Sequence, residues 1–368
     1  MSEATTLKGL VLAGGTGSRL RPLTYAMPKQ LVPVANRPIL WFALDSIVSA
    51  GVADIGIIIS PETGEAIKQS LYAWLETQDD EVALTFIPQE TPAGLAHAVK
   101  IAEPYLQQSP FLMYLGDNLI DADLKPWCDN FSSQSSISAS ILLKPVDNPS
   151  SFGVAVLDET GHVTRLVEKP KEPPSNLALV GVYLFRPNIF TAIQAIQPSP
   201  RGELEITDAI QHLITSGSTV RSEQQTSWWL DTGKKDDLLS ANQTVLASLA
   251  RKSMDLTPEL DASNTVSGFV QLGENASLTN CTIIGPVAIG DGCHLSNVTL
   301  GPNVSLGASS TVIDSTLRDS VVLDGCTLKG VQLVNSLLGY RCTLTGPAQT
   351  LPPVSVSLAE QSVLHWGP

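Results

Sequence analysis

The chain is short of aromatic and charged residues, and its few cysteines form no evident pairs. Aromatic side chains make up 5% and charged side chains 16% of its 368 residues. The five cysteines are odd in number and show no CxxC spacing, so we expect no disulfide framework and a reducing, cytoplasmic location. No apolar run approaches the roughly 18 residues that span a membrane. The polar start MSEATTLKG does not have the pattern of a signal peptide.

Several common catalytic and binding patterns are also missing. The five histidines do not cluster, and neither a Ser/His/Asp triad nor a zinc spacing occurs. The glycines fit neither GxxxxGK[ST] nor GxGxxG, which excludes a Walker A loop and a dinucleotide fingerprint. A formal net charge of −14 argues against non-specific binding to nucleic acid or to an anionic membrane, so we expect neither as a partner.

The most informative stretch that is present runs from Leu10 to Pro33, LVLAGGTGSRLRPLTYAMPKQLVP. There an apolar run ends in glycines, and basic residues follow: Gly14, Gly15, Gly17, Arg19, Arg21 and Lys29. Glycines let backbone N–H groups approach a phosphate closely, and Arg and Lys supply the matching charge. The plain alternative is a glycine-rich turn between a strand and a helix, with basic residues on the surface.

Residues 7 to about 240 alternate apolar runs with amphipathic stretches, which predicts a mostly parallel βαβ sheet. LKGLVLAG, ADIGIIIS, VALTFIP and PFLMYLGD read as strands, and RPILWFALDSIVSAG and AGLAHAVKIAEPYL read as helices. Ligands of such sheets bind at the carboxyl ends of the strands. Because Gly14 follows one strand and Asp117 follows another, we expect both residues at the same edge of the sheet.

From about residue 270 the pattern changes to rows of 17 residues. Counted from Val270, four successive rows begin with valine, and small or β-branched residues recur every five or six positions. This hexapeptide pattern predicts a parallel β-helix with one triangular coil per row. It places three cysteines in the core: Cys281, Cys293 and Cys326. The predicted segments are an α/β domain (1–240), a linker helix and loop (241–269), a β-helix (270–346) and a C-terminal tail (347–368).

The strings LAGGxGxRLxPLT and PKQLVPV resemble the sugar-1-phosphate nucleotidylyltransferases. Gln30 after Lys29 favours the thymidylyl branch, because the guanylyl and adenylyl branches usually show KP there and bacterial uridylyl members KE. Ser18 stands where most members have threonine. The hexads resemble the left-handed β-helix of acyltransferases. The resemblances imply an α/β fold, with a Rossmann-like three-layer nucleotidylyltransferase domain followed by a left-handed parallel β-helix.

The resemblance also implies a reaction. A thymidylyl group would pass from dTTP to α-D-glucose 1-phosphate, giving dTDP-glucose and pyrophosphate. Mg²⁺ is the implied cofactor, held by Asp117 and Asp231, each beside a glycine after an apolar run. Taken singly, each aspartate reads as a turn or cap residue. The implied catalytic residues are Arg19, Lys29, Lys169 and Asp117.

The remaining implied site residues fall into two sets. The nucleotide set includes a glutamine, which offers both a donor and an acceptor to a pyrimidine edge. Its members are Leu12, Gly14, Gly15, Gly17, Ser18, Arg19, Gln30, Gln89 and Gly94. The sugar-phosphate set includes one departure, Val180, where short-form enzymes usually carry threonine. Its members are Asn118, Gly153, Glu168, Lys169, Val180 and Glu203.

Three alternatives stay open. The first is a uridylyltransferase acting on a hexose or N-acetylhexosamine 1-phosphate, since dTTP and UTP differ at the base only by a methyl group, which pockets discriminate weakly. The second adds an acetyltransferase activity in the β-helix, for which His294, at a core-adjacent position, is the one candidate base among the coils. The third is a regulatory protein with a degenerate catalytic half. A homo-oligomer, trimeric or tetrameric, is expected.

Overall fold

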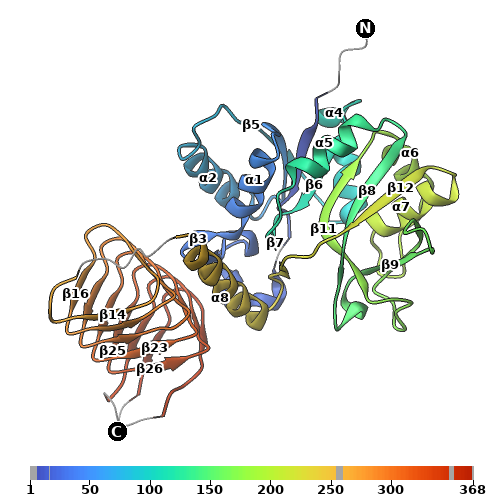
Figure 1. Ribbon diagram of the computed structural model, residues 1–368. Helices are drawn as coiled ribbons and strands as arrows, with labels where there is room; N and C mark the ends of the chain where they lie inside the picture. The colour runs from blue at the N-terminus through green and yellow to red at the C-terminus, as the bar shows by residue number, and fades with distance from the viewer. Residues whose placement is uncertain (1–5, 16, 254–259, 348–351, 367–368) are drawn as a thin grey trace. The chain divides into compact units, whose positions relative to one another are not determined.

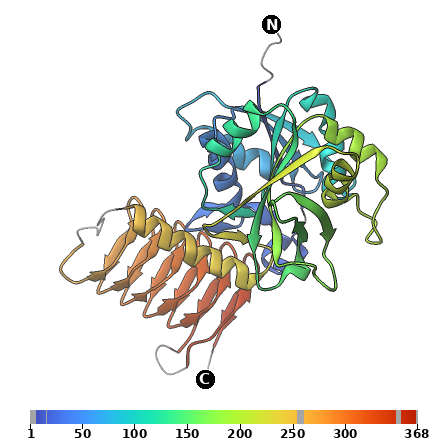
Figure 2. The same cartoon turned by 45° about the vertical axis from the view of Figure 1, so that its right-hand side comes forward.

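The computed structural model describes residues 6–15, 17–253, 260–347 and 352–366 (Figures 1 and 2). The chain divides into two compact units. The described residues of 1–15 and 40–231 form the first unit, and those of 16–39 and 232–368 form the second.

The first unit is built on a nine-stranded mixed sheet in the order β10-β9-β11-β6-β1-β4-β5, with β8 pairing β11 and β12 pairing β8. Strands β1, β4, β5 and β6 run parallel, whereas β11 is antiparallel to β6. The strands are β1 (Lys8–Leu12), β4 (Asp54–Ile59), β5 (Ala83–Pro88), β6 (Phe111–Leu115), β8 (Ile137–Pro145), β9 (Gly153–Leu157), β10 (Val163–Glu168), β11 (Leu177–Phe185) and β12 (Thr219–Gln224). A separate two-stranded sheet pairs β7 (Asn118–Ile120) with β13 (Trp229–Asp231).

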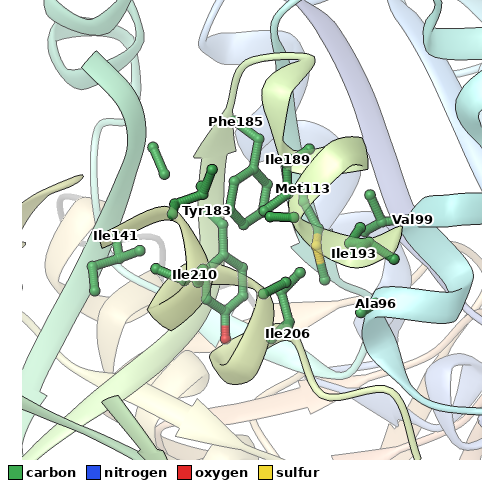
Figure 3. Close-up of a cluster of buried hydrophobic side chains, with 14 of the residues drawn as sticks. Ala96, Val99, Met113, Ile141, Tyr183, Phe185, Ile189, Ile193, Ile206 and Ile210 are labelled. Carbon is green, nitrogen blue, oxygen red and sulfur yellow. The ribbon is translucent and has the colours of Figure 1, made fainter. Parts of the chain in front are cut away.

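Helices cover both faces of this sheet (Figure 1). They are α1 (Ile39–Ser49), α2 (Gly64–Leu75), α3 (Leu95–Ile101), α4 (Glu103–Leu106), α5 (Lys125–Ser133), α6 (Asn188–Ala195) and α7 (Ile206–Thr215), with a short 3-10 turn η4 (Pro149–Ser151). Leu10 and Leu12 pack into a core with α3, α6 and α7, part of which Figure 3 shows. On the other face, Gly9 lies against Ile47 of α1. Successive β1 residues are therefore buried on alternate faces, as in a three-layer α/β domain.

The carboxyl ends of β1, β4, β5 and β6 meet at one edge because these strands are parallel. Gly14 follows β1 and Asp117 follows β6 at this edge, which confirms the expectation from the sequence. One predicted helix is wrong: AGLAHAVKIAEPYL splits into α3 and α4. Pro104 in the first turn of α4 explains the break, since proline lacks the N–H of a helix interior.

The second unit contains a short segment, one long helix and the repeats. The segment holds η1 (Ser18–Leu20), η2 (Leu23–Tyr25), η3 (Lys29–Leu31) and the hairpin of β2 (Pro33–Val34) and β3 (Arg37–Pro38), and the helix is α8 (Lys235–Lys252).

The repeats form three parallel sheets, each with one strand per coil. The first has β14 (Thr265–Ser267), β17 (Thr282–Ile284), β20 (Thr299–Leu300), β23 (Thr316–Arg318) and β26 (Gln332–Val334). The second has β15 (Val270–Leu272), β18 (Val287–Ile289), β21 (Val304–Leu306), β24 (Val321–Val322), β27 (Leu337–Leu338) and β29 (Ser357–Leu358). The third has β16 (Ser277–Thr279), β19 (His294–Ser296), β22 (Thr311–Ile313), β25 (Thr327–Lys329), β28 (Thr343–Thr345) and β30 (Val363–His365).

The predicted fold class is therefore confirmed: a Rossmann-like α/β domain is followed by a β-helix of the three-sheet type. The β-helix is longer than the range 270–346, because β14 begins it at Thr265 and β29 and β30 add a further coil within the tail. Its core holds Cys281, Cys293 and Cys326, as expected. His294 differs from the expectation, since its side chain is exposed on β19 and not next to the core. None of the described helices is long and apolar enough to cross a membrane.

Candidate active site

The predicted nucleobase residues lie together at the carboxyl ends of β1 and β5. Leu12 ends β1, Gly14 and Gly15 follow it, and Gln89 directly follows β5. The Oε1 atom of Gln89 lies 3.5 Å from where a Cβ on Gly14 would be. On the other side, Gln89 Nε2 donates a hydrogen bond of 2.9 Å to His97 Nδ1. Burial, and then the charge of Lys100, lowers the pKa of His97 below its usual value of 6.5, so the ring is neutral at pH 7 and can accept this bond.

His97 is a residue whose role sequence reasoning missed. Its bond occupies the donor end of the Gln89 amide and leaves Oε1 on the side of Gly14. The spacing of eight residues between the two gave no signal, because their contact depends on how α3 packs after β5.

Gly94 holds the start of α3 against the segment that carries Glu203. Its backbone has φ 100° and ψ 171°, a region that is essentially restricted to glycine. A Cβ here would lie 2.4 Å from the carbonyl oxygen of Leu204 and 3.0 Å from Glu203 Cβ. The backbones are also bonded, with Leu204 N–H donating to the Ala93 carbonyl at 2.8 Å.

We predict that Gly94→Ala lowers the free energy of unfolding by about 3 kcal/mol or more, because backbone strain and overpacking add. Gly161→Ala is the matched control: Gly161 also has a positive φ, of 83°, but no atom lies within 4 Å of its would-be Cβ. It should lose only the strain, about 1 kcal/mol. Urea denaturation of both variants measures the difference, and equal losses would contradict the packing argument.

The two predicted metal ligands come together across the two-stranded sheet. Asp231, the last residue of β13, is the register partner of Asn118, the residue next to Asp117. Asn118 is 3% exposed, donates from Nδ2 to Asp117 Oδ1 at 3.1 Å and accepts from Trp229 Nε1 at 2.6 Å. In this structure the buried amide of Asn118 is bonded to the Asp117 carboxylate, and its expected sugar contact stays a prediction.

This donor set fits a magnesium ion. Mg²⁺ prefers oxygen ligands and commonly takes one or two carboxylates, with substrate phosphates and waters completing its shell. Over the described parts of the chain, no group of three or more His, Cys, Asp and Glu residues could hold a metal ion. Two half-buried carboxylates, Asp117 in the turn before β7 and Asp231 at the end of β13, therefore match a metal that arrives with phosphate, and do not match a closed structural zinc site.

The predicted sugar residues form a second group, on β9 and β10. Gly153 is the register partner of Glu168, and a Cβ on Gly153 would lie 3.2 Å from Glu168 Oε2 and 2.7 Å from Thr207 Cγ2. Glu168 accepts a hydrogen bond from Thr207 Oγ1 at 3.2 Å and pairs with Lys169 Nζ at 3.4 Å. The glycine thus leaves the Glu168 carboxylate accessible beside the backbone of β9.

Arg201 connects the sugar group to Glu203, which lies against Gly94 of the nucleobase group. Arg201 was not among the predicted site residues. Its guanidinium reaches Glu168 at 3.5 Å, Glu203 at 3.2 Å and Glu205 at 3.2 Å. A pocket of about 790 Å³ is lined by Glu168, Lys169 and Arg201 among others. The string RGELEITD could have indicated this cluster, since Arg201 precedes two glutamates, Glu203 and Glu205, within five residues.

Two acidic groups of the same pocket are shifted by their surroundings. Burial raises the pKa of Glu205, which is 3% exposed, and the hydrogen bond from Ser199 opposes that shift. Burial, and then the charge of Glu168, raises the pKa of Asp208. Arg201 offsets part of this acidic excess. Val180, in contrast, is fully buried within β11 in this structure, and its expected sugar contact stays a prediction.

The remaining predicted residues belong to the second unit. Gly17, with φ 64°, lies against Lys29: a Cβ on Gly17 would be 2.6 Å from Lys29 Cβ. Ser18 and Arg19 are exposed on η1, and Gln30 is 1% exposed on η3. Gln30 Oε1 is one of the buried side-chain atoms among the described residues that have no hydrogen-bond partner.

Comparisons with known proteins agree with this arrangement. A family model described as nucleotidyl transferase matches residues 8–248. A glucose-1-phosphate thymidylyltransferase from Streptomyces antibioticus is 43% identical over 340 residues, which cover 92% of this chain and 94% of that protein. The low-salt glycan biosynthesis nucleotidyltransferase Agl11 from Haloferax volcanii is 43% identical over 349 residues, covering 94% and 96%. A solved structure from Bacillus anthracis, assigned as a glucose-1-phosphate thymidylyltransferase, is 34% identical with a TM-score of 0.61, covering 68% of this chain and 98% of that one. The chain belongs to the nucleotidyl transferase family.

Proposed function

We propose that the protein transfers a thymidylyl group from dTTP to α-D-glucose 1-phosphate and releases pyrophosphate. The observation that carries this proposal is a continuous path of contacts between the two predicted ligand sides. Gly94, on the nucleobase side, abuts Glu203, which pairs with Arg201, which in turn reaches Glu168 on the sugar side. The glucose-1-phosphate thymidylyltransferases named above support the choice of substrates.

Base recognition follows from the orientation of Gln89. With Nε2 bonded to His97, Oε1 is the atom that can accept the N3–H of a thymine or uracil base. The backbone N–H of Gly94 would donate to a neighbouring base carbonyl, and Leu12 would cover the ring. Cytosine has no N3–H to donate at neutral pH, so this arrangement favours a dTTP or UTP substrate.

The chemistry needs little more than positioning and charge neutralisation. The nucleophile is a phosphate oxygen of glucose 1-phosphate, which is anionic near neutral pH, so no general base is required. Its bond to the α-phosphorus forms while the bond from that phosphorus to the pyrophosphate oxygen breaks. Lys169 orients the attacking phosphate, Glu168 binds sugar hydroxyls, and Arg19 and Lys29 neutralise the leaving pyrophosphate. A Mg²⁺ ion held by Asp117 and Asp231 would supply further positive charge between the phosphates.

The test is a matrix of nucleoside triphosphates against sugar 1-phosphates, read by pyrophosphate release. We expect the highest kcat/KM for dTTP with glucose 1-phosphate. Preference for UTP would favour the uridylyl alternative, and no release with any pair would favour a degenerate catalytic half. Acetyl transfer from acetyl-CoA that is lost in His294→Ala would instead assign an activity to the β-helix. We place the reaction in the cytoplasm, which suits five buried, unpaired cysteines.

We also propose that the chain forms a homo-oligomer through the β-helix. On the third sheet of the β-helix, the outward positions of neighbouring coils carry Ser277, His294 and Thr311, none of them buried. Light scattering of the full chain should give the mass of a trimer or tetramer. A monomer across the micromolar range would contradict this prediction.

A further inference from the structure

The segment that carries Lys29 and Gln30 ends in a strained hairpin turn. Ala35 and Asn36 connect β2 to β3, and both have positive φ, 48° and 60°. Two-residue turns of this kind suit hairpins, but alanine adopts left-handed backbone angles at a cost of about 1–2 kcal/mol. Strands of two residues each add little stability. Such a turn persists only where its surroundings hold it.

Asn242 of α8 stabilises the turn by hydrogen bonding. Its Oδ1 accepts a hydrogen bond of 2.8 Å from the Ala35 N–H and one of 2.6 Å from Ser305 Oγ. Its Nδ2 donates to the carbonyl of Asn303 at 3.2 Å. The turn makes one further bond, of 2.9 Å, from Asn36 Nδ2 to the carbonyl of Leu306. We call these four bonds the hairpin tether, because they join the turn to α8 and to one coil of the β-helix.

The polar residues of the tether are not needed for the coil itself. Ser305 stands between Val304 and Leu306, which belong to the core of the β-helix, so Ser305 lies on the outward face of β21. Helix α8 packs against β21, and Figure 2 shows it running along one side of the β-helix. The register partners of Ser305 in the coils on either side are Ala288 and Val321, both buried and apolar. Ser305 and Asn242 are 0% and 1% exposed, and buried polar groups are costly unless they are paired. The Ser305 hydroxyl therefore finds its hydrogen-bond partner in Asn242, because the residues beside it on the outward face, Ala288 and Val321, are apolar.

The chain segment between the tether and the predicted nucleotide-binding residues Lys29 and Gln30 is short, and its side chains are well packed. Gln30 and Ala35 are five residues apart, and Val32 and Val34 between them are fully buried. Val32 N–H donates to the Lys29 carbonyl at 3.2 Å, and Ile39 N–H donates to the Val32 carbonyl at 3.3 Å. Movement of the turn would therefore displace η3, which carries Lys29 and Gln30.

We propose that Asn242 and Ser305 are positioning residues, through which the β-helix fixes Lys29 and Gln30 for nucleotide binding and turnover. The proposal rests on the proposed function for the roles of those two residues. It gives the β-helix a part in catalysis without a catalytic residue of its own. It also assigns Asn242 a role that α8 packing alone does not require.

The experiment compares Asn242→Ala and Ser305→Ala with the wild-type chain. We expect kcat/KM for dTTP to fall roughly tenfold, since small misplacements of positioning groups cost that much or more, while KM for glucose 1-phosphate changes less than about twofold. Hydrogen exchange at the Ala35 amide should accelerate in both variants, because its acceptor is lost or loosened.

Ser320→Ala is the matched control for general destabilisation. Ser320 is also 0% exposed in the β-helix, and its hydroxyl accepts from Ser336 N–H at 3.1 Å without contacting the hairpin. It should lower the Tm as much as Ser305→Ala does and leave kcat/KM for dTTP unchanged. Equal losses of activity in both serine variants, or an unchanged Ala35 amide in Asn242→Ala, would overturn the proposal. A wild-type chain inactive with every substrate pair would refute the proposed function instead, and exchange at Ala35 would then decide the tether by itself.

Discussion

Asp117→Asn and Asp231→Asn are each expected to lower kcat with Mg²⁺ by at least about tenfold, while the fold is kept. Asp117 directly precedes β7, and Asp231 on the paired strand β13 is the register partner of Asn118, the neighbour of Asp117. An asparagine keeps the size of each side chain but removes the charge that a divalent ion requires. Pyrophosphate release at several Mg²⁺ concentrations measures the effect, and the apparent KM for Mg²⁺ should rise in both variants.

Asp147→Asn provides the control, because Asp147 is an exposed loop aspartate outside the proposed site. Its variant should retain the wild-type rate, and circular dichroism should show all three variants folded. Wild-type rates in either Asp117→Asn or Asp231→Asn would remove the metal assignment. Because Asn118 orients Asp117 through a 3.1 Å bond, Asn118→Ala should show a milder loss of the same kind.

The features of the fold that follow from local patterns could be predicted from the sequence. Apolar runs bounded by glycine and polar residues predicted β1, β4 and β6, because strands buried on both faces read as continuous apolar segments. The edge strand β5 was also predicted, although none of its residues is fully buried. The 17-residue rows gave the β-helix, because each coil repeats the same inward positions. The ends of the β-helix were missed: Thr265–Ser267 reads as loop by itself and is a strand only because β17 lies beside it.

Residue type and position in a motif marked the candidate site residues Asp117, Asp231, Gln89, Gly153 and Glu168, and their roles stay predictions. The structure shows where they lie: at the carboxyl ends of the parallel strands, across the β7–β13 pair and across the β9–β10 pair. Residues that act through tertiary contacts were not marked by the sequence, because their partners lie far along the chain.

Arg201 meets Glu168 across 33 positions, and Trp229 meets Asn118 across 111. Val180 shows the opposite limit, since its motif position is clear but the sequence did not indicate that the packing of β11 buries it completely.

The hairpin tether illustrates the same limit at the scale of the chain. A sequence reading divides the protein into a catalytic half and a repeat half, whereas residues 17–39 share a compact unit with the repeats. Asn242 and Ala35 are 207 positions apart, and nothing in either local sequence marks their bond. The loop with the most recognisable motif is thus supported by the part of the chain that reads as a separate scaffold.

Arg19→Ala is expected to weaken nucleotide binding and to lower kcat/KM for dTTP by roughly ten- to a hundredfold. A charge-assisted contact to a phosphate contributes about 1.5–3 kcal/mol, and a tenfold change in a rate or binding constant corresponds to about 1.4 kcal/mol. Arg19 is exposed on η1, directly after the glycines that would cradle the phosphates. Burial raises the pKa of Asp237, and the charges of Lys234 and then Arg19 offset only part of that rise. The Arg19 side chain is therefore available to a ligand. It contributes little to the packing of the fold, so its removal should not lower nucleotide binding by destabilising the protein.

Arg21→Ala is the comparison within the same loop. The Arg21 guanidinium lies 4.9 Å from the centre of the Tyr25 ring, so its charge is engaged by an aromatic face two residues away from Arg19. Removing it takes the same charge from the same loop and should reduce kcat/KM by no more than about threefold. Steady-state kinetics together with calorimetric titration of dTTP separate the two variants. If both variants lose activity equally, Arg19 acts through the overall positive charge of the loop and not through a specific contact. If Arg19→Ala binds and turns over dTTP normally, the loop does not hold the phosphates.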